Sequence, residues 1–481
     1  MEFDAVIVGS GPNGLSAGIV MQQAGLSSLI IEGNSSIGGG LRSTELTLPG
    51  YLHDICSAIH PFAVASAFFN KLPLNSYGLE YIYPALAAAH PFDGGKAAVL
   101  ASSIEKTGLS LGQDAAAYQA LMQPLEKRWP LISDFVMDPL KFPSRPLQLS
   151  NFCCRALLPA SRFVDKYFKY SSARGFIGGM AAHSAQPLTN WATSAVALVL
   201  LLLGHGKGWP IPKGGSGEIS RALGAYYESL GGKIETNTWI KGLDQLPSAR
   251  AILLDVTPRQ LLQIAGHRLS ALYTWQLNRY RYGSGVFKID WALAGPIPFT
   301  APECRLAGTL HLGNSMEEIT AAEQDTWAGK QVENPFVILA QQSLFDSSRA
   351  PAGKQVAWAY CHVPNGSAFN MTSAIEKQVE RFAPGFKDLI LARHVMTNQD
   401  MENYNPNYIG GDIGGGVQDI GQLFTRPALR LSPYRSSTKG IYLCSSSTPP
   451  GGGVHGMCGY HAAQQALKDI FMNRSKQISF L

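Results

Sequence analysis

The chain has 481 residues, of which 46% are hydrophobic and only 15% are charged, and its formal net charge is +5. Average proteins carry about 25% charged residues, so a large core, an apolar substrate tunnel or contact with a membrane surface is expected. The basic residues form no run, which excludes a typical nucleic-acid-binding surface. The seven cysteines contain no CxxC pair, which argues against a disulfide reductase and predicts free thiols in a reducing compartment.

The first motif lies at the N-terminus, where a buried strand is predicted over residues 4–8 and a helix over residues 15–24. The segment Gly9-Ser10-Gly11-Pro12-Asn13-Gly14 joins them, and a second strand over 29–31 ends at Glu32. In a dinucleotide-binding βαβ unit, such glycines allow a tight turn, close approach of a pyrophosphate and close helix packing, and the acid binds ribose hydroxyls. The dinucleotide-binding residues predicted for this unit are Gly9, Gly11, Pro12, Asn13, Gly14, Glu32 and Gly33.

A second glycine cluster, Gly38-Gly39-Gly40-Leu41-Arg42, follows this unit closely. It resembles the second signature of the flavin amine oxidase and phytoene desaturase superfamily of oxidoreductases. The resemblance implies that the dinucleotide is FAD and that Arg42 contacts its phosphates. It also implies that Gly39, Gly40 and Leu41 bind the cofactor.

The middle of the chain resembles the return of this superfamily's chain to the FAD domain. A helix is predicted over residues 218–230 and strands over 233–240 and 251–256. The resemblance implies that Ile240, at the end of the first strand, lies beside the adenine. The segment 241–250 is shorter than the hairpin that is usual at this place, which predicts a trimmed FAD domain.

The C-terminus carries a second strand, glycine loop and helix, predicted over residues 440–444, 451–456 and 459–471. It resembles the segment of the superfamily whose glycines pack against the flavin ring, with Ser446 where many members carry an acid. A helix N-terminus at this place would stabilise negative charge on a reduced flavin. The cofactor-binding residues that the resemblance implies here are Ser446, Gly453 and Val454.

These motifs predict an α/β fold with two domains. Residues 1–60, 205–265 and 425–481 are expected to form a three-layer, Rossmann-type FAD-binding domain. Residues 61–204 and 266–424 are expected to form a discontinuous, mixed-sheet α+β substrate-binding domain. Its local patterns resemble the phytoene-dehydrogenase-like (pyridine nucleotide-disulfide oxidoreductase domain-containing protein 2) branch of the superfamily, at residues 54–61, 285–291, 360–364, 410–416 and 423–427.

The most apolar run, residues 195–203, extends weakly back to Trp191 and is too short to span a bilayer, which needs about 20 residues. It predicts either a buried helix or a helix that dips into a membrane surface. The N-terminus shows no secretory signal. A cytoplasmic protein is therefore expected, with peripheral membrane contact as an alternative.

Three residues are candidates for catalysis. His455 lies in the C-terminal glycine loop, His60 follows the first FAD segments, and Lys288 lies in an alternating strand pattern. The resemblance to amine oxidases implies that such a lysine holds a water beside the flavin, whereas a salt-bridged lysine is the structural alternative. The other candidates are expected to be structural: His362 as a satisfied histidine, and Asp290 and Asp412 in turn-capping or surface roles rather than as general bases.

The glycines of residues 410–416 predict either a close approach of backbone to cofactor or a lid hinge. The histidine spacing predicts no metal site. Overall, the resemblance implies hydride transfer to flavin N5 from a C–H bond of a small apolar substrate, isoprenoid or carotenoid-like, with a quinone or oxygen as the electron acceptor. The alternatives are a flavin amine oxidase, a non-redox polyene isomerase that uses reduced FAD, and a catalytically inactive FAD-binding interaction protein.

Overall fold

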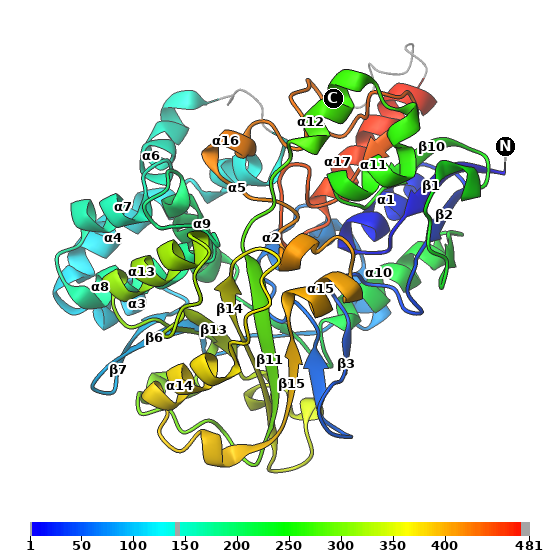
Figure 1. Ribbon diagram of the computed structural model, residues 1–481. Coiled ribbons are helices and arrows are strands. Elements are labelled where there is room, and N and C mark those ends of the chain that lie inside the picture. Colours follow the sequence, from blue (N-terminus) through cyan, green and yellow to red (C-terminus); the bar gives the residue numbers. More distant parts are fainter. Residues whose placement is uncertain (1, 140–144, 473–481) are drawn as a thin grey trace.

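The computed structural model describes residues 2–139 and 145–472. Figure 1 shows a dinucleotide-binding unit that contains both ends of the described chain, a helical layer, and a large sheet beneath them. The predicted α/β fold is confirmed, with one parallel and one mixed sheet. Among the described residues, no helix is both long and apolar enough to cross a membrane.

The smaller sheet has five parallel strands drawn from distant parts of the chain. In spatial order they are β16 (Ile441–Leu443), β10 (Ala249–Leu254), β1 (Phe3–Val8), β2 (Ser28–Ile31) and β9 (Lys233–Glu235). Successive side chains of a strand point to opposite faces, and residues 5–8 of β1 are all apolar and buried, so both faces of the sheet are covered. The sheet is therefore the middle of three layers.

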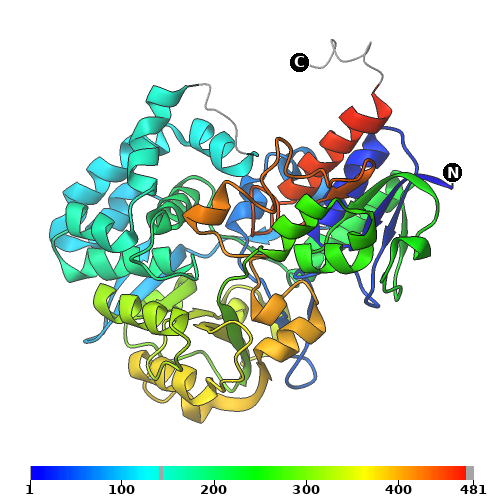
Figure 2. The ribbon, with the colours of Figure 1, turned by 45° about the horizontal axis from the view of Figure 1, so that its top comes forward.

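Helices cover one face of this sheet. Ala5 and Ile7 of β1 pack into the core beneath these helices, which are α1 (Pro12–Gln23), α10 (Gly217–Ser229) and α17 (Met457–Ala466). Figures 1 and 2 both show α17 beside α1. A Cβ atom at Gly459 of α17 would clash with the carbonyl of Asn13, so only glycine permits this close packing.

The opposite face is covered by a loop and by two short helices. Val6 packs with Ile240 and Leu246 of the segment that follows β9. Val8 belongs to a core that includes residues of the two helices, which are α11 (Pro258–Ala265) and α12 (Ala271–Asn278). Helix α12 thus packs on the dinucleotide unit although it lies beyond the predicted boundary at residue 265.

The prediction of a strand over residues 233–240 is wrong in its second half. Strand β9 ends at Glu235, and Asn237 has a φ of 58°, which no continuing strand adopts. The chain then crosses the sheet, and the Trp239 indole covers Gly33 so closely that a Cβ atom there would clash with it. Among residues 236–248, the structure contains no strand, in agreement with the predicted trimming of this edge.

The larger sheet has seven strands, mostly antiparallel, with one parallel pair between β12 and β6. In spatial order they are β15 (Ile390–Met396), β11 (Gly285–Leu293), β14 (Gln355–Val363), β13 (Val337–Ala340), β12 (Ala307–Leu312), β6 (Leu86–Phe92) and β7 (Lys96–Leu100). Two small antiparallel pairs complete the strands: β3 (Ser43–Glu45) with β4 (Leu52–Asp54), and β5 (Tyr81–Ile82) with β8 (Ile211–Pro212).

A helical layer packs on one face of this sheet, and α14 (Thr372–Phe382) packs on the other. The layer and its neighbours contain α3 (Ile104–Ser110), α4 (Ala115–Glu126), α5 (Trp129–Met137), α6 (Pro146–Ala156), α7 (Ala160–Tyr167), α8 (Ser171–Ala182), α9 (Thr193–Gly206) and α13 (Met316–Trp327). The remaining short helices are α2 (Pro61–Ala65), α15 (Asn398–Tyr404) and α16 (Ile420–Leu423).

Helix α9 holds the most apolar run of the chain. Residues 197–205 of this helix are buried, and they pack against α4, α6 and α8 and against the large sheet. Of the two interpretations of this run, the structure favours the buried helix. The burial of this run in the core explains its low charge.

Candidate active site

One cavity of about 790 Å³ is lined by residues from both sheets. One part of its wall, called the dinucleotide end here, consists of residues 8–13, 31–34, 39–42, 238–241 and 255–257. Another part, called the apolar end, consists of His60, Phe62, His183, Leu200, Trp209, Thr309, Ile338, Trp358 and Tyr360. The cavity thus joins the predicted cofactor site to side chains of the substrate-binding domain.

The glycine loop after β1 forms the floor of the dinucleotide end. Gly9 has a φ of 98°, which permits the tight turn into α1. A Cβ atom at Gly11 would lie 2.9 Å from a carboxylate oxygen of Asp255, and one at Gly14 would clash with the Gly9 carbonyl. The loop therefore requires its glycines for close packing, and it leaves the N-terminus of α1 open toward the cavity.

Glu32 and Arg42 form an ion pair at the edge of the dinucleotide end. One Glu32 oxygen accepts the Ser10 N–H at 3.0 Å, and the other lies 3.2 Å from the Arg42 guanidinium. The guanidinium also donates to the Ser36 carbonyl at 2.6 Å and to the Gly39 carbonyl at 3.2 Å. Both side chains lie on the cavity wall, and the phosphate contact of Arg42 stays a prediction.

Asp255 is a residue of this end that the sequence motifs did not reveal. It follows β10, is oriented toward the glycine loop, and accepts the Gly14 N–H at 3.0 Å. Burial raises its pKa to about 7, and the charge of Glu32 adds to this effect. An acid at the carboxyl end of a buried strand could have indicated Asp255. The sequence does not show, however, that β10 pairs with β1 and so brings this acid to the glycine loop.

The C-terminal segment closes another side of the cavity. Ser446, Gly453 and Val454 lie on its wall, as does Gly415 of the predicted glycine-rich segment. The Gly415 carbonyl accepts the Ser447 hydroxyl at 2.7 Å. The segment 410–416 therefore packs directly against the C-terminal segment, which favours the interpretation of a close backbone approach over that of a lid hinge.

His455 does not belong to the described wall of this cavity. Its Nδ1 accepts the Met457 N–H at 3.0 Å, and its Nε2 lies 3.2 Å from the Gly451 carbonyl. Burial lowers its pKa to about 4. The ring thus caps the start of α17 from inside the glycine loop, and the prediction of a catalytic His455 finds no support in this geometry.

Lys288 also lies apart from the described wall. Its ammonium group pairs with Asp290, and only 2% of its side chain is exposed. Asp290 is fully buried and has His53 at 3.6 Å and His394 at 3.8 Å, so the predicted surface role of Asp290 is wrong. The structure favours the salt-bridged alternative for Lys288.

Two other candidates have the structural roles that were expected. His362 is bonded through Nδ1 to Glu323 at 2.9 Å. Asp412 is buried and accepts the N–H groups of Gly283, Gly414 and Gly416 at 2.7–2.9 Å, so it caps the glycine turn. Among the residues that the structure describes, no cluster of side chains could hold a metal ion.

His60 is the one catalytic candidate on the cavity wall, and it lies at the apolar end. Most of the other residues there carry no sequence signal, because they come one by one from separate elements. Trp358 and Tyr360 of β14 stack with ring centroids 5.5 Å apart. His183 bonds through Nε2 to Nε2 of His311 at 2.8 Å, and burial lowers its pKa to about 3.

The two ends differ in charge. Glu32, Arg42, Lys241 and Asp255, which carry the formal charges among the described wall residues, all lie at the dinucleotide end. The histidines of the apolar end, His60 and His183, have pKa values lowered by burial to about 4 and about 3. The apolar end is thus uncharged at neutral pH.

Comparisons with known proteins agree with this arrangement. Residues 7–72 match the family described as NAD(P)-binding Rossmann-like domain. The whole chain is similar to pyridine nucleotide-disulfide oxidoreductase domain-containing protein 2 of Rattus norvegicus, with 24% identity that covers 98% of this chain and 94% of the relative. The predicted superfamily and branch are thereby confirmed.

Further similarities are found in sequence and in fold. A subunit of limonene dehydrogenase from Castellaniella defragrans is 21% identical, over 98% of this chain and 96% of that protein. Among solved structures, an oxidoreductase from Methanosarcina mazei matches with a TM-score of 0.66 and 14% identity over 96% of this chain and 99% of that chain. A putrescine oxidase matches with a TM-score of 0.63 and 16% identity over 97% and 98%. The superfamily relation supports an oxidoreductase, and the structural matches show the shared fold.

Proposed function

We propose that the protein is an FAD-dependent oxidoreductase that removes hydrogen from an uncharged, largely apolar compound, of which isoprenoids are the first class to test. The observation that carries this proposal is the contrast in charge within one cavity. Charged groups and backbone N–H groups gather at the dinucleotide end, whereas aromatic and aliphatic side chains dominate the apolar end. Such a site fits a charged cofactor beside an uncharged substrate.

The residues present at the dinucleotide end fit FAD. The N-terminus of α1 and the side-chain-free Gly11 leave room and N–H donors for a pyrophosphate. Glu32 would hold a ribose, and the C-terminal segment with Ser446, Gly453 and Val454 would face the flavin. When bound, FAD would supply the hydride acceptor, and reoxidation by a quinone or oxygen is part of the proposal.

This chain's own contribution is binding, orientation and exclusion of water. Phe62, Leu200, Trp209 and Ile338 give the apolar end walls that stabilise an apolar compound by removing its surface from water. The stacked Trp358 and Tyr360 add a flat aromatic wall. Two relatives support the class of substrate by their names, which are those of a limonene dehydrogenase and a 4,4'-diapolycopen-4-al dehydrogenase.

An amine oxidase is the competing hypothesis, because putrescine oxidase and cyclohexylamine oxidase share the fold. An ammonium group that leaves water needs a carboxylate or an aromatic cage to compensate for its lost hydration. The described apolar end contains no carboxylate that could pair with an ammonium group, and its aromatic rings include one stacked pair, Trp358 and Tyr360. The uncharged substrate is therefore favoured.

The test has two steps. First, the visible absorption spectrum of the purified protein is recorded before and after heat release of the cofactor; flavin bands with recovered FAD are expected. Second, anaerobic reduction of the bound flavin is followed with terpene hydrocarbons, terpene alcohols and primary amines. Reduction by terpenes supports the proposal. Reduction by amines alone would replace it with the amine oxidase, and a protein that cannot be reconstituted with FAD would refute it.

A further inference from the structure

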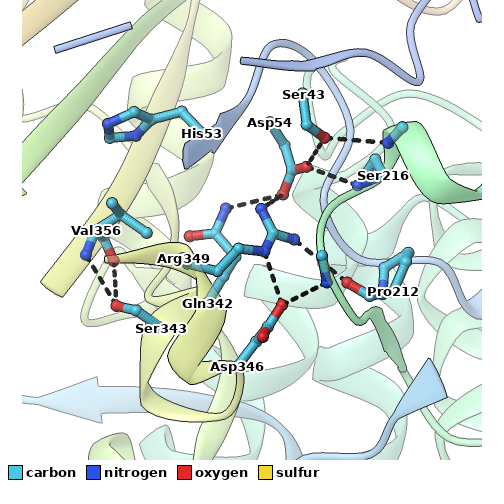
Figure 3. Close-up of polar contacts among 12 residues, drawn as sticks. Ser43, His53, Asp54, Pro212, Ser216, Gln342, Ser343, Asp346, Arg349 and Val356 are labelled. Carbon is cyan, nitrogen blue, oxygen red and sulfur yellow. Dashed lines mark hydrogen bonds and ion pairs between the residues drawn. The ribbon is translucent and has the colours of Figure 1, made fainter. Parts of the chain in front are cut away.

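A buried polar network lies behind His60. Asp54 accepts the Ser216 N–H at 2.8 Å and the Arg349 guanidinium at 3.1 Å, and neither Asp54 nor Arg349 is exposed to solvent. Figure 3 shows Ser216 and Arg349 converging on Asp54 from two sides. Arg349 also pairs with Asp346 at 2.9 Å and donates to the Pro212 carbonyl at 3.3 Å. The network thus fixes the position of Ser216.

Ser216 determines which nitrogen of His60 carries the proton. The Ser216 hydroxyl lies 2.6 Å from the Ser57 carbonyl, which can only accept, so the hydroxyl hydrogen is donated there. His60 Nε2 lies 2.8 Å from the same hydroxyl oxygen and therefore donates its N–H to it. Burial lowers the pKa of His60 to about 4, so the ring is neutral at pH 7 and its Nδ1 keeps a free lone pair.

His60 Nδ1 is buried without a hydrogen-bond partner among the described residues. Two other polar atoms of the apolar end share this condition: Oγ1 of Thr309 and Nε1 of Trp358. A buried polar group without a partner costs free energy that a suitably placed ligand recovers. A pure hydrocarbon in the cavity would leave all three unpaired.

His60 also lies where the apolar end meets the C-terminal segment of the cavity wall. Its backbone N–H donates to the Pro210 carbonyl at 3.0 Å, beside Trp209 of the apolar end. Phe62, two residues on, lies so close to the C-terminal glycine loop that a Cβ atom at Gly453 would be 3.3 Å from its ring. A group bonded to His60 would thus lie between the aromatic walls and the segment proposed to face the flavin.

We propose that His60 is a specificity-determining residue whose Nδ1 accepts a hydrogen bond from a hydroxyl group of the substrate, so that the substrate class is an apolar alcohol rather than a hydrocarbon. This inference rests on the proposed function, because it assigns a role at the same cavity. A hydroxyl is a neutral donor, which suits an end without carboxylates, and its oxygen can in turn accept from a donor such as the Trp358 N–H.

The test compares alcohols with their methyl ethers, which keep the oxygen but lack the donor. Geraniol and farnesol, and the methyl ether of each, are titrated by calorimetry into FAD-loaded protein whose flavin has first been reduced under argon, so that no turnover occurs. The alcohol is expected to bind about tenfold more tightly than its ether. Equal binding within both pairs, or binding of no compound, would overturn the inference and leave water as the partner of Nδ1.

Variants of His60 and Ser216 test whether His60 Nδ1 is the atom that accepts the hydrogen bond of the substrate hydroxyl. His60→Phe should remove the preference for the alcohol over its ether, which is measured as the ratio of the two dissociation constants. Ser216→Ala frees the ring to carry its proton on Nδ1 and should reduce the preference to an intermediate value. The matched control is Ser220→Ala in α10, the helix that begins directly after Ser216. The Ser220 hydroxyl bonds to the Leu41 and Gly217 carbonyls, so this variant should leave the preference unchanged. A preference that persists in His60→Phe would also overturn the inference.

Failure of this inference is distinguishable from failure of the proposed function. A protein that holds FAD and is reduced by terpene hydrocarbons, yet binds alcohol and ether equally, retains the proposed function and loses the role of His60. A protein that holds no FAD loses the proposed function, and the titration of the FAD-free protein then tests His60 alone.

Discussion

The two ends of the cavity are built in different ways. The dinucleotide end consists mainly of backbone, with glycines that admit a ligand and a helix N-terminus that presents N–H groups, and its residues lie in a few contiguous segments. The apolar end consists of single side chains from helices and strands that are far apart in the sequence. Backbone recognition leaves a spaced glycine motif, whereas side-chain recognition by scattered residues leaves none.

A substitution in the glycine loop should abolish FAD binding at the dinucleotide end. Gly11→Val places a branched side chain beside Asp255 and in the space proposed for the pyrophosphate, so FAD binding should be lost. FAD content is measured by the visible spectrum after reconstitution, and folding by circular dichroism. The control is Gly206→Ala, where a Cβ atom meets nothing within 4 Å and FAD binding should persist. Normal FAD occupancy in Gly11→Val would refute the placement of the phosphates.

Loss of the buried ion pairs behind the apolar end should have the next largest effect, which is a lower free energy of unfolding. Arg349→Leu leaves the buried carboxylates of Asp54 and Asp346 without their cation, and a broken buried pair costs about 3–5 kcal/mol in free energy of unfolding. Urea unfolding measures this loss. Arg221→Leu, which removes a half-exposed pair with Glu218, should cost less than about 1 kcal/mol. Similar losses for the two variants would contradict the role of the network.

Asp255 should make the stability of the FAD-free protein depend on pH. Its pKa is raised from 3.8 to about 7 in the folded state, so across this range the folded protein binds more protons than the unfolded chain. The free energy of unfolding should therefore fall by a few kcal/mol as pH rises from about 4 to 7 and then level off.

Asp255→Asn should flatten this dependence, since the amide does not titrate and its oxygen can still accept the Gly14 N–H. The matched control is Asp325→Asn, an exposed carboxylate paired with Lys330, which should leave the profile of the native protein unchanged. Thermal melts across this pH range provide the measurement. An unchanged slope in Asp255→Asn would show that another group titrates.

The smallest effect is expected at the edge of the dinucleotide end. Arg42→Ala removes the partner of Glu32 and the proposed phosphate contact, and it should weaken FAD binding by about tenfold without abolishing it. Titration of the FAD-free variant with FAD measures the change. An unchanged affinity would count against Arg42 as a phosphate contact and would leave it the structural role of holding the Ser36 and Gly39 carbonyls.

Sequence reasoning located the elements of the dinucleotide unit better than the chemistry of the apolar end. The strand–glycine–helix order around Gly11 and the C-terminal strand and helix were predicted to within a few residues. His455 and Lys288 were weaker predictions, because a position near a motif does not give the direction of a side chain. The cap of α17 and the partner Asp290 decide those directions.

What the sequence by itself determined is the α/β class, the dinucleotide-binding unit and the superfamily, because glycine spacing and strand periodicity are local properties of the chain. Only the tertiary structure decided that Asp255 lies against the glycine loop, that α9 is a core helix, and that His60 shares a cavity wall with Trp358. These are pairings between distant segments. They depend on which surfaces bury one another, and no local pattern specifies that choice.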